Sequence, residues 1–233
     1  MNAQRVQAIF EKDIKDFMKN TMVLFTPILP IVMAILYSRM GEGTDEEMPM
    51  MIIYIVVGVT YSAVAAGCMM MLMAEENEKK TLRGLILSPA SFMDIIIGKS
   101  LVTTLLTVVS LAISLLIMGI EPLLHVQTII GLVLLFLFFL FLGIGVGLFV
   151  KSVGITTAYL MPIMFLFGFT PMIELLGFAD DSLTMKIASY FPIPQLIDMH
   201  ETHSWMPIVV VAIWTLAAAL FTIVCFKNVK RDE

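Results

Sequence analysis

Charged side chains are scarce in this sequence. Only 14% of the 233 residues are Asp, Glu, Lys or Arg, whereas 59% are hydrophobic. A water-soluble domain carries roughly a quarter charged residues, so an ordinary soluble protein is excluded. Cysteine is also rare: Cys68 and Cys225 are the two in the chain, both fall within apolar stretches, and we expect buried thiols rather than a structural disulfide.

Long stretches without any charge account for more than half of the chain. They cover residues 21–38, 50–73, 100–120, 126–150, 154–173 and 204–226. Each is about as long as the roughly 20-residue helix that crosses a bilayer. The apolar runs are continuous rather than alternating, which favours helices over a β-barrel. We therefore predict an all-α membrane protein in which residues 1–233 form one transmembrane domain with six spans.

The basic residues fall on one side of these spans. All but two of the 14 Lys and Arg residues lie before span one, between spans two and three, between spans four and five, or after span six. The two exceptions are Arg39 and Lys186. Cytoplasmic loops are enriched in Lys and Arg. We therefore expect a multi-pass protein of the cell membrane with both chain ends in the cytoplasm.

Three further segments have informative patterns. Residues 3–20 alternate apolar and charged faces at helical spacing, which predicts an amphipathic helix, either in the membrane interface or packed on protein. Gly143–Gly147 allows close helix contact, either within one chain or between two. Residues 174–203 are apolar but interrupted by Pro192 and Pro194. They predict one or two short helices that re-enter the outer leaflet.

Two short motifs resemble functional sites but lack a required residue. Gly98–Ser100 is similar to the end of a phosphate-binding loop, yet Met93 stands where its first glycine would be. Lys99 is instead expected to anchor a span at the inner interface. His200–His203 is similar to a zinc-protease motif, yet Ser204 replaces the second histidine. We predict no catalytic residue, metal site or nucleotide site on this chain.

The predicted spans contain no charged residue that could bind a coupling ion. Pumps driven by protons or other ions use charged side chains inside the membrane. The driving force for any transport is therefore expected to come from elsewhere.

The loop between spans two and three, residues 74–99, is the most informative segment. It opens with acidic residues, which the positive end of a helix dipole favours. Leu82, Leu85 and Ile86 then form an apolar stripe, and Pro89 ends the helix. The pattern predicts a short amphipathic helix at the membrane surface. A partner that gripped this helix could move spans two and three together.

At these residues the chain resembles the ABC-2 type permeases, the membrane subunits of ATP-driven exporters. The family pattern is an acidic stretch, Thr-Leu, a Leu-rich turn, Ser/Thr-Pro-x-Ser, and an apolar helix ending in Gly-Lys. The matching residues are Glu76, Glu78, Thr81, Leu82, Leu85, Ile86, Ser88, Pro89, Ser91, Gly98 and Lys99, whereas Lys80 and Arg83 depart from the pattern. The resemblance implies that an ATPase acts through the helix around residues 76–88, which Pro89 ends.

The resemblance also implies a half-transporter that binds no cofactor itself. The chain has no Walker motif, so separate cytoplasmic ATPase subunits would bind ATP and Mg²⁺. A second permease chain, identical or related, would complete the pore, and no nucleic acid is expected as a partner. In the family, spans one and five line the interface between permeases. Pro27, Pro30, Pro162 and Pro171 lie in these spans and are candidates for the translocation path or gate.

The expected cargo is hydrophobic or amphipathic, such as a drug or an antimicrobial or toxin peptide exported from a bacterial cell. Two other classes remain open. A secondary transporter or channel without an ATPase would fit six spans equally well, but it leaves the surface helix unexplained. A membrane enzyme or assembly scaffold is the other, and the absence of charged residues from the spans counts against the enzyme.

Overall fold

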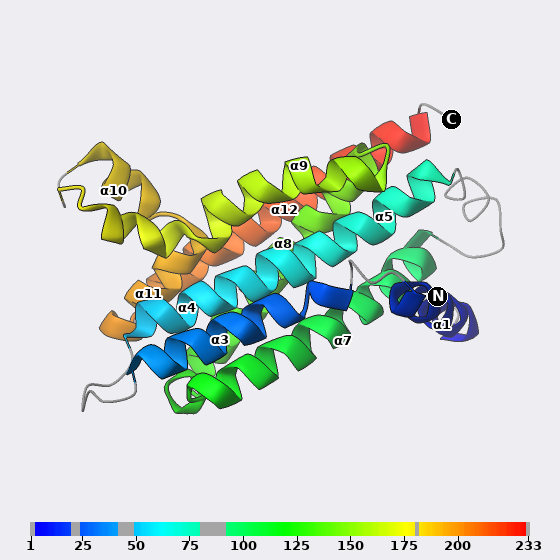
Figure 1. Ribbon diagram of the computed structural model, residues 1–233. Coiled ribbons are helices and arrows are strands. Elements are labelled where there is room, and N and C mark those ends of the chain that lie inside the picture. The colour runs from blue at the N-terminus through cyan, green and yellow to red at the C-terminus, as the bar shows by residue number, and fades with distance from the viewer. Residues whose placement is uncertain (1–2, 20–23, 42–48, 80–91, 180–181, 232–233) are drawn as a thin grey trace.

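The computed structural model describes residues 3–19, 24–41, 49–79, 92–179 and 182–231. Within these ranges the regular elements are all helices, arranged as an elongated bundle (Figure 1). They are α1 (Ala3–Lys19), α3 (Ile28–Gly41), α4 (Met50–Val59), η1 (Thr60–Cys68), α5 (Met69–Glu78), α7 (Phe92–Met118), η2 (Glu121–Leu123), α8 (Val126–Phe149), α9 (Val153–Ile163), η3 (Met164–Gly168), η4 (Thr170–Leu176), α10 (Leu183–Ala188), α11 (Pro192–Thr202) and α12 (Met206–Arg231). The predicted all-α class is confirmed.

Within the part of the chain that the structure describes, four helical stretches are long and apolar enough to cross a membrane. They are Met50–Glu78, Met93–Met118, Val126–Phe149 and Met206–Asn228. Two shorter apolar helices, Ile28–Met40 and Val153–Gly168, correspond to the remaining predicted spans. Each predicted span is thus mostly helical where the structure describes it, and the count of six crossings stays a prediction.

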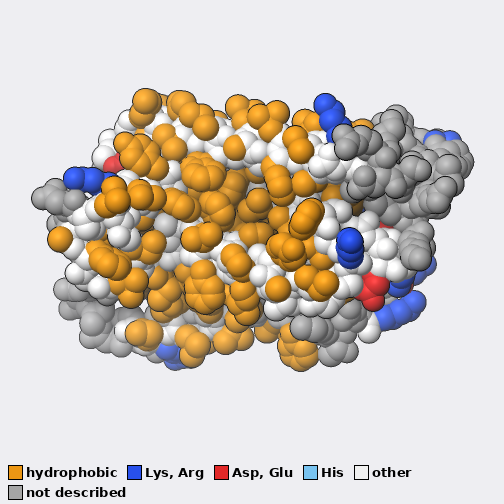
Figure 2. All heavy atoms as spheres, turned by 90° about the horizontal axis from the view of Figure 1, so that it is seen from above, with side chains coloured by type: hydrophobic (Ala, Val, Ile, Leu, Met, Phe, Trp, Pro, Cys, Tyr) orange, Lys and Arg blue, Asp and Glu red, His pale blue; other side chains and the backbone are white. Residues whose placement is uncertain are grey.

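The stretch Met50–Glu78 forms the centre of the bundle. In the most apolar 18 residues of this stretch, 89% of the residues are buried. In the most apolar 18 residues of α12 the buried share is 28%. Helices α3, α7, α8, α9 and α11 pack around it, and α12 covers the outer side of α8. The bundle surface is a broad apolar belt, with charged side chains at its two ends (Figure 2). A surface of this kind is stable against lipid rather than water.

Glycines on α8 allow its close approach to the central helix. A Cβ added to Gly143 would lie 2.6 Å from the carbonyl oxygen of Ala66, and one on Gly147 would lie 2.7 Å from Cβ of Met73. Both distances are shorter than side-chain carbons tolerate, so only glycine fits. The Gly143–Gly147 pattern therefore serves packing within the chain.

Two stretches adopt π-helical geometry, in which hydrogen bonds run from residue i to i+5. One is η1, which continues α4 into α5, and the other is η3, which follows Pro162 in α9. They pack against each other. A Cβ on Gly168 would lie 2.6 Å from Oγ of Ser62, so this contact also depends on a glycine. π-helical turns are uncommon and often occur at functional sites.

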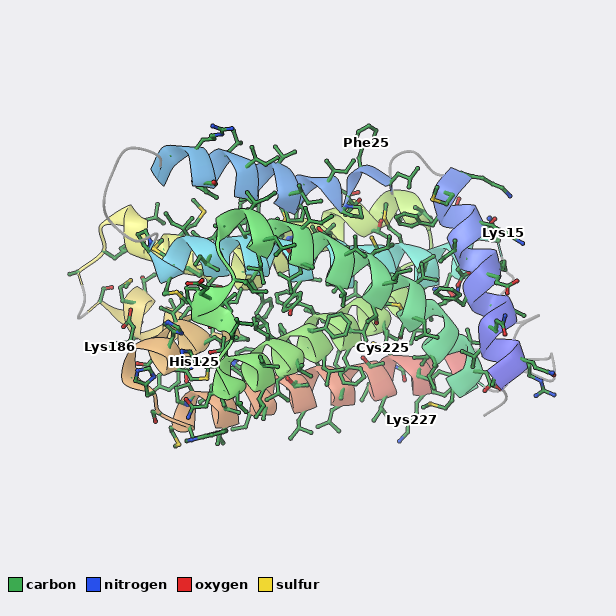
Figure 3. All side chains as sticks on the ribbon, turned by 90° about the horizontal axis from the view of Figure 1, so that it is seen from below. Lys15, Phe25, His125, Lys186, Cys225 and Lys227 are labelled. Atoms are coloured by element: carbon green, nitrogen blue, oxygen red, sulfur yellow. The ribbon has the colours of Figure 1, made fainter. Side chains whose placement is uncertain are left out.

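The N-terminal helix α1 lies across one end of the bundle, at a steep angle to the other helices (Figure 3). It packs against α7, with Val6, Asp13 and Phe17 buried. The amphipathic helix predicted from residues 3–20 is confirmed in its described part, and its apolar face contacts protein. In the segment 174–203, η4, α10 and α11 provide the expected short helices. Their re-entry into a membrane leaflet stays a prediction.

Candidate functional site

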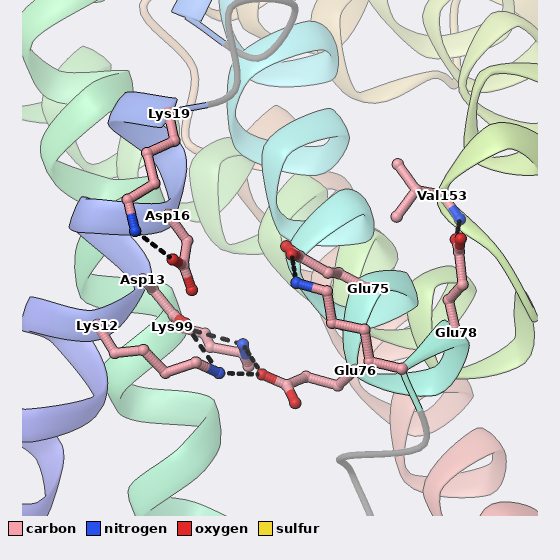
Figure 4. A network of polar contacts seen from close by, with 10 residues as sticks. Lys12, Asp13, Asp16, Lys19, Glu75, Glu76, Glu78, Lys99 and Val153 are labelled. Atoms are coloured by element: carbon pink, nitrogen blue, oxygen red, sulfur yellow. Dashed lines mark hydrogen bonds and ion pairs between the residues drawn. The ribbon is translucent and has the colours of Figure 1, made fainter.

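The last turn of α5 carries consecutive polar residues that reach different neighbouring helices, and Figure 4 shows two of them, Glu76 and Glu78. Successive residues on an α-helix point about 100° apart, since 3.6 residues complete a turn. Glu76, Asn77 and Glu78 therefore project in three directions. Together they connect the end of the central helix to four other helices, and we call these three residues the α5 junction.

Asn77 caps the end of α8. Its Nδ2 donates hydrogen bonds to the carbonyl oxygens of Gly147 at 3.1 Å, Leu148 at 3.1 Å and Val150 at 2.9 Å. The last carbonyls of a helix have no partner within that helix. Asn77 supplies one from a residue 70 positions away in the sequence. This contact holds the C-terminus of α8 against α5.

Glu78 binds the start of the next helix. Its Oε2 accepts a hydrogen bond of 2.7 Å from the backbone N–H of Val153, the first residue of α9. The first N–H groups of a helix are unpaired within it, and the helix dipole there favours a carboxylate. Glu78 and Asn77 thus hold both sides of the short connection between α8 and α9.

Glu76 belongs to a group of charges that we call the ion cluster. Its members are the buried Asp13, Glu76 and Lys99, and Lys12, whose side chain is 51% exposed. The Nζ of Lys99 lies 3.0 Å from Oε1 of Glu76 and 3.1 Å from Oδ2 of Asp13. The Nζ of Lys12 lies 2.8 Å from the same Glu76 oxygen. Asp13, Glu76 and Lys99 are 2%, 3% and 1% exposed. The cluster therefore joins α1, α5 and α7 beneath the surface.

The ion cluster fixes the position of α1 against the central helix more than it adds to the stability of the fold. Burial raises the pKa of Asp13 above its ordinary value, although Lys99 opposes this shift. Desolvation of the carboxylate thus outweighs the attraction of its partner. Buried ion pairs commonly contribute little net stability, because desolvation offsets the Coulomb attraction. They do require their partners to meet in one geometry, and here that geometry holds α1 against the central helix.

Sequence patterns alone did not predict that the residues of the ion cluster contact one another. Lys99 was expected to anchor a span at the interface, but it is buried and paired with two carboxylates. The apolar stretches do lack charges, yet the helices extend beyond them and bring Glu76 and Lys99 into contact. Asp13 offered a signal: it shares a helix face with the buried Val6 and Phe17. An acid in an apolar stripe indicates a buried partner.

The other predicted site residues are only partly placed. Thr81, Leu82, Leu85, Ile86 and Pro89, the predicted ATPase-contacting helix, lie outside the described residues. Glu76 and Glu78, the acidic residues before them, belong to the α5 junction.

The four prolines lie at breaks in regular helix geometry. Pro27 is in a turn before α3, and its carbonyl accepts a 2.7 Å hydrogen bond from Oγ of Ser110. Pro30 lies in the first turn of α3, where the missing N–H is tolerated. Pro162 precedes the π-helical η3, and Pro171 lies in η4, a 3₁₀-helix. Regular α-helix is thus interrupted in both predicted spans, and a role of the prolines in gating stays a prediction.

The long apolar helices and the apolar belt define a multi-pass membrane protein. Residues 43–226 match the family model described as ABC-2 family transporter protein. Since the match covers most of the chain, the protein belongs to the ABC-2 family transporter proteins and is a membrane permease of an ABC transporter. Permeases of this family are generally the non-catalytic membrane component of the transporter. No curated protein sequence matches this chain.

Replacement of Asn77 tests the α5 junction. We expect Asn77→Ala to lower the free energy of unfolding by about 1–2 kcal/mol, because the α8 carbonyls lose their donor. Asn77→Asp should cost more than alanine, because a carboxylate would face carbonyl oxygens at the negative end of a helix dipole. Thermal unfolding in detergent measures both. Asn228→Ala, an exposed change on α12, is the control and should have no measurable effect. An aspartate variant as stable as wild type would contradict the assigned contact.

Proposed function

We propose that this chain is the permease subunit of an ATP-driven exporter, moved by separate ATPase subunits that act on the segment following α5. The observation that carries the proposal is the α5 junction. Glu76, Asn77 and Glu78 connect the end of the central helix to α1, α7, α8 and α9. A displacement applied just beyond Lys79 would therefore reach four helices at once.

The distribution of charge supports a cytoplasmic position for this end of the bundle. Both chain ends lie there (Figure 1), as do Lys15 and Lys227, whereas Lys186 and His125 lie at the opposite end (Figure 3). Cytoplasmic segments of membrane proteins are enriched in basic residues. ATP, Mg²⁺ and the ATPase would then be on the side where α5 ends, in the plasma membrane of a bacterial cell.

Exposed apolar faces on α3 and α9 support assembly with a second permease chain. Leu36 on α3 is 60% exposed, and Phe165 and Leu166, just after α9, are 63% and 56% exposed. We propose that two chains, identical or related, meet along these helices and enclose the path. A path with such walls carries few charges, which favours a hydrophobic or amphipathic cargo such as a drug or a toxin peptide. Export of that cargo would confer resistance.

Capture of the ATPase tests the proposal. Because Glu76 is buried in the ion cluster, its removal would disturb the bundle itself. The sharper variant is Leu82→Asp with Leu85→Asp, which places charge on the predicted apolar stripe. Leu183→Asp, the same kind of substitution at one 73% exposed position on α10, is the control. We expect the tagged wild type and the control to capture an ABC ATPase from native membranes, identified by mass spectrometry, and the double variant to lose it.

Two results would contradict this function. One is equal recovery of the ATPase by the double variant and the wild type. The other is full transport in liposomes that contain no nucleotide-hydrolysing subunit.

One observation favours a second candidate, an ion-coupled transporter without an ATPase. The ion cluster holds two buried carboxylates, which is the chemistry that proton coupling requires. It lies at the end of the bundle, however, whereas coupling sites usually lie near the middle of the membrane. Transport driven by an imposed pH gradient in liposomes of the purified chain would favour this candidate over the exporter.

A further inference from the structure

A cavity of about 740 Å³ opens at the end of the bundle opposite the chain ends. Its wall is built from the start of α4 together with η4, α10 and α11. Cavities of roughly 300–1,000 Å³ with mainly apolar walls and a few polar groups are typical of small-molecule sites. The size of this cavity therefore suits a drug-sized molecule. The chemistry of the residues that line it indicates which class of molecule would bind.

One part of the wall is apolar and adaptable. Met50 and Met51 come from α4, Met185 comes from α10, and Tyr190 follows α10. Methionine side chains are flexible and polarizable, so they fit ligands of varied shape. Tyr190 is 66% exposed and contributes an aromatic ring, a group that attracts cations as well as apolar groups.

The other part of the wall is acidic. Asp198 and Glu201 lie three residues apart on α11 and so share one helix face. The wall residues that the structure describes include no Lys, Arg or His. Among the described residues no Lys or Arg forms an ion pair with either carboxylate. The cavity therefore combines an apolar surface with negative charge that the described part of the chain does not neutralise.

Nearby basic groups do not alter this balance. His200 lies between the two acids in the sequence, but burial and the neighbouring His125 hold its pKa below the ordinary value. Its imidazole is therefore uncharged at neutral pH. Lys186, at the end of α10, is exposed and is not part of the wall.

We propose that this cavity binds a cationic amphipathic molecule. Its positive group pairs with Asp198 and Glu201, and its apolar body lies against the methionines and Tyr190. This inference rests on the proposed function, and it narrows the cargo class to cations at the end of the bundle where exported molecules leave. An anionic amphiphile of the same shape would face two carboxylates and would bind more weakly.

Two ions of the same shape and opposite charge separate these possibilities. Tetraphenylphosphonium is the cationic probe and tetraphenylborate is the anionic one. Binding of each is measured by equilibrium dialysis against the purified full chain in nanodiscs, with empty nanodiscs as the background. The variant is Asp198→Asn with Glu201→Gln, which keeps the shape of both side chains. Glu121→Gln, an exposed acid in η2 outside the wall, is the control for charge.

We expect the wild type and the Glu121→Gln control to bind the cation saturably. The double variant should bind it about fivefold more weakly or worse, as the loss of two partly exposed charge contacts implies. Binding of the borate should stay equal or tighten in the double variant, which also shows that the cavity is intact. Equal affinity of wild type and double variant for the cation would overturn the proposal, as would wild-type binding of the borate as tight as that of the cation.

The test is independent of the exporter proposal, because it uses neither ATP nor an ATPase. Charge-selective binding by a chain that captures no ATPase would contradict the exporter proposal but support the binding site. ATP-driven transport by a chain that shows no charge-selective binding would contradict the proposed binding site and leave the exporter proposal intact.

Discussion

Lys99→Met is expected to lower the free energy of unfolding by about 3–5 kcal/mol, because it leaves two buried carboxylates without their shared cation. Methionine matches the length of the lysine stem, so packing on α7 is retained and the lost charge is the main change. Glu76 keeps its contact with Lys12, whereas Asp13 loses its closest cation. The apparent unfolding midpoint, followed by circular dichroism in mild detergent, measures the loss.

The same substitution at a surface pair is the control for Lys99→Met. Lys79 pairs with Glu75 on the exposed side of the last α5 turn. Because exposed ion pairs contribute at most about 1 kcal/mol, Lys79→Met should change the midpoint little. Replacement of the three buried members by Asp13→Leu, Glu76→Gln and Lys99→Met should recover most of the loss, since no buried charge then lacks a partner. Equal, small effects at Lys99 and Lys79 would show that the ion cluster is not buried as described.

Gly143→Leu is expected to destabilise the bundle by about 3 kcal/mol or more, through overpacking between α8 and the central helix. The new Cβ would meet backbone atoms of Ala66, at 2.6 Å from the oxygen and 2.8 Å from Cα. Backbone cannot move aside as a side chain can, so the two helices must separate. Size-exclusion chromatography and thermal unfolding in detergent should show aggregation or a large fall in the unfolding midpoint.

Gly154→Leu is the matched control for Gly143→Leu. Gly154 lies in the first turn of α9, and an added Cβ there meets no atom within 4 Å. We expect wild-type stability or a small gain, because glycine is a poor helix former. The pair also tests whether the Gly143–Gly147 pattern serves packing within the chain, as the contacts with Ala66 and Met73 indicate. A Gly143→Leu protein that folded normally but lost a dimeric mass would assign the pattern to contact between chains.

The helices were predictable because their causes are local. Uninterrupted apolar runs indicated the long helices, and the face pattern of residues 3–20 indicated α1. The short helices of 174–203 followed from apolar content broken by Pro192 and Pro194. Each inference used residues within a few turns of one another.

The site could not be predicted in the same way, because its partners are far apart in the chain. Lys99 and Asp13 are separated by 86 positions, and Asn77 is 70 positions from Gly147. No periodicity within one helix specifies which side chain of another helix it will meet. Lys99 alone resembled an interface anchor, since a lysine at the foot of a span commonly extends to water. Only the folded arrangement shows that its Nζ points inward.

The π-helical turns in η1 have a geometric consequence for the end of the central helix. A single π turn holds one residue more than the α turn it replaces. If one such turn tightened to α geometry, the rest of the helix would rotate by about 100° around its axis. Glu76, Asn77 and Glu78 would then face different neighbours, while the backbone stayed hydrogen-bonded throughout, as a lipid environment demands. The geometry of η1 would thus let the α5 end of the central helix rotate about the helix axis while the helix stayed continuous.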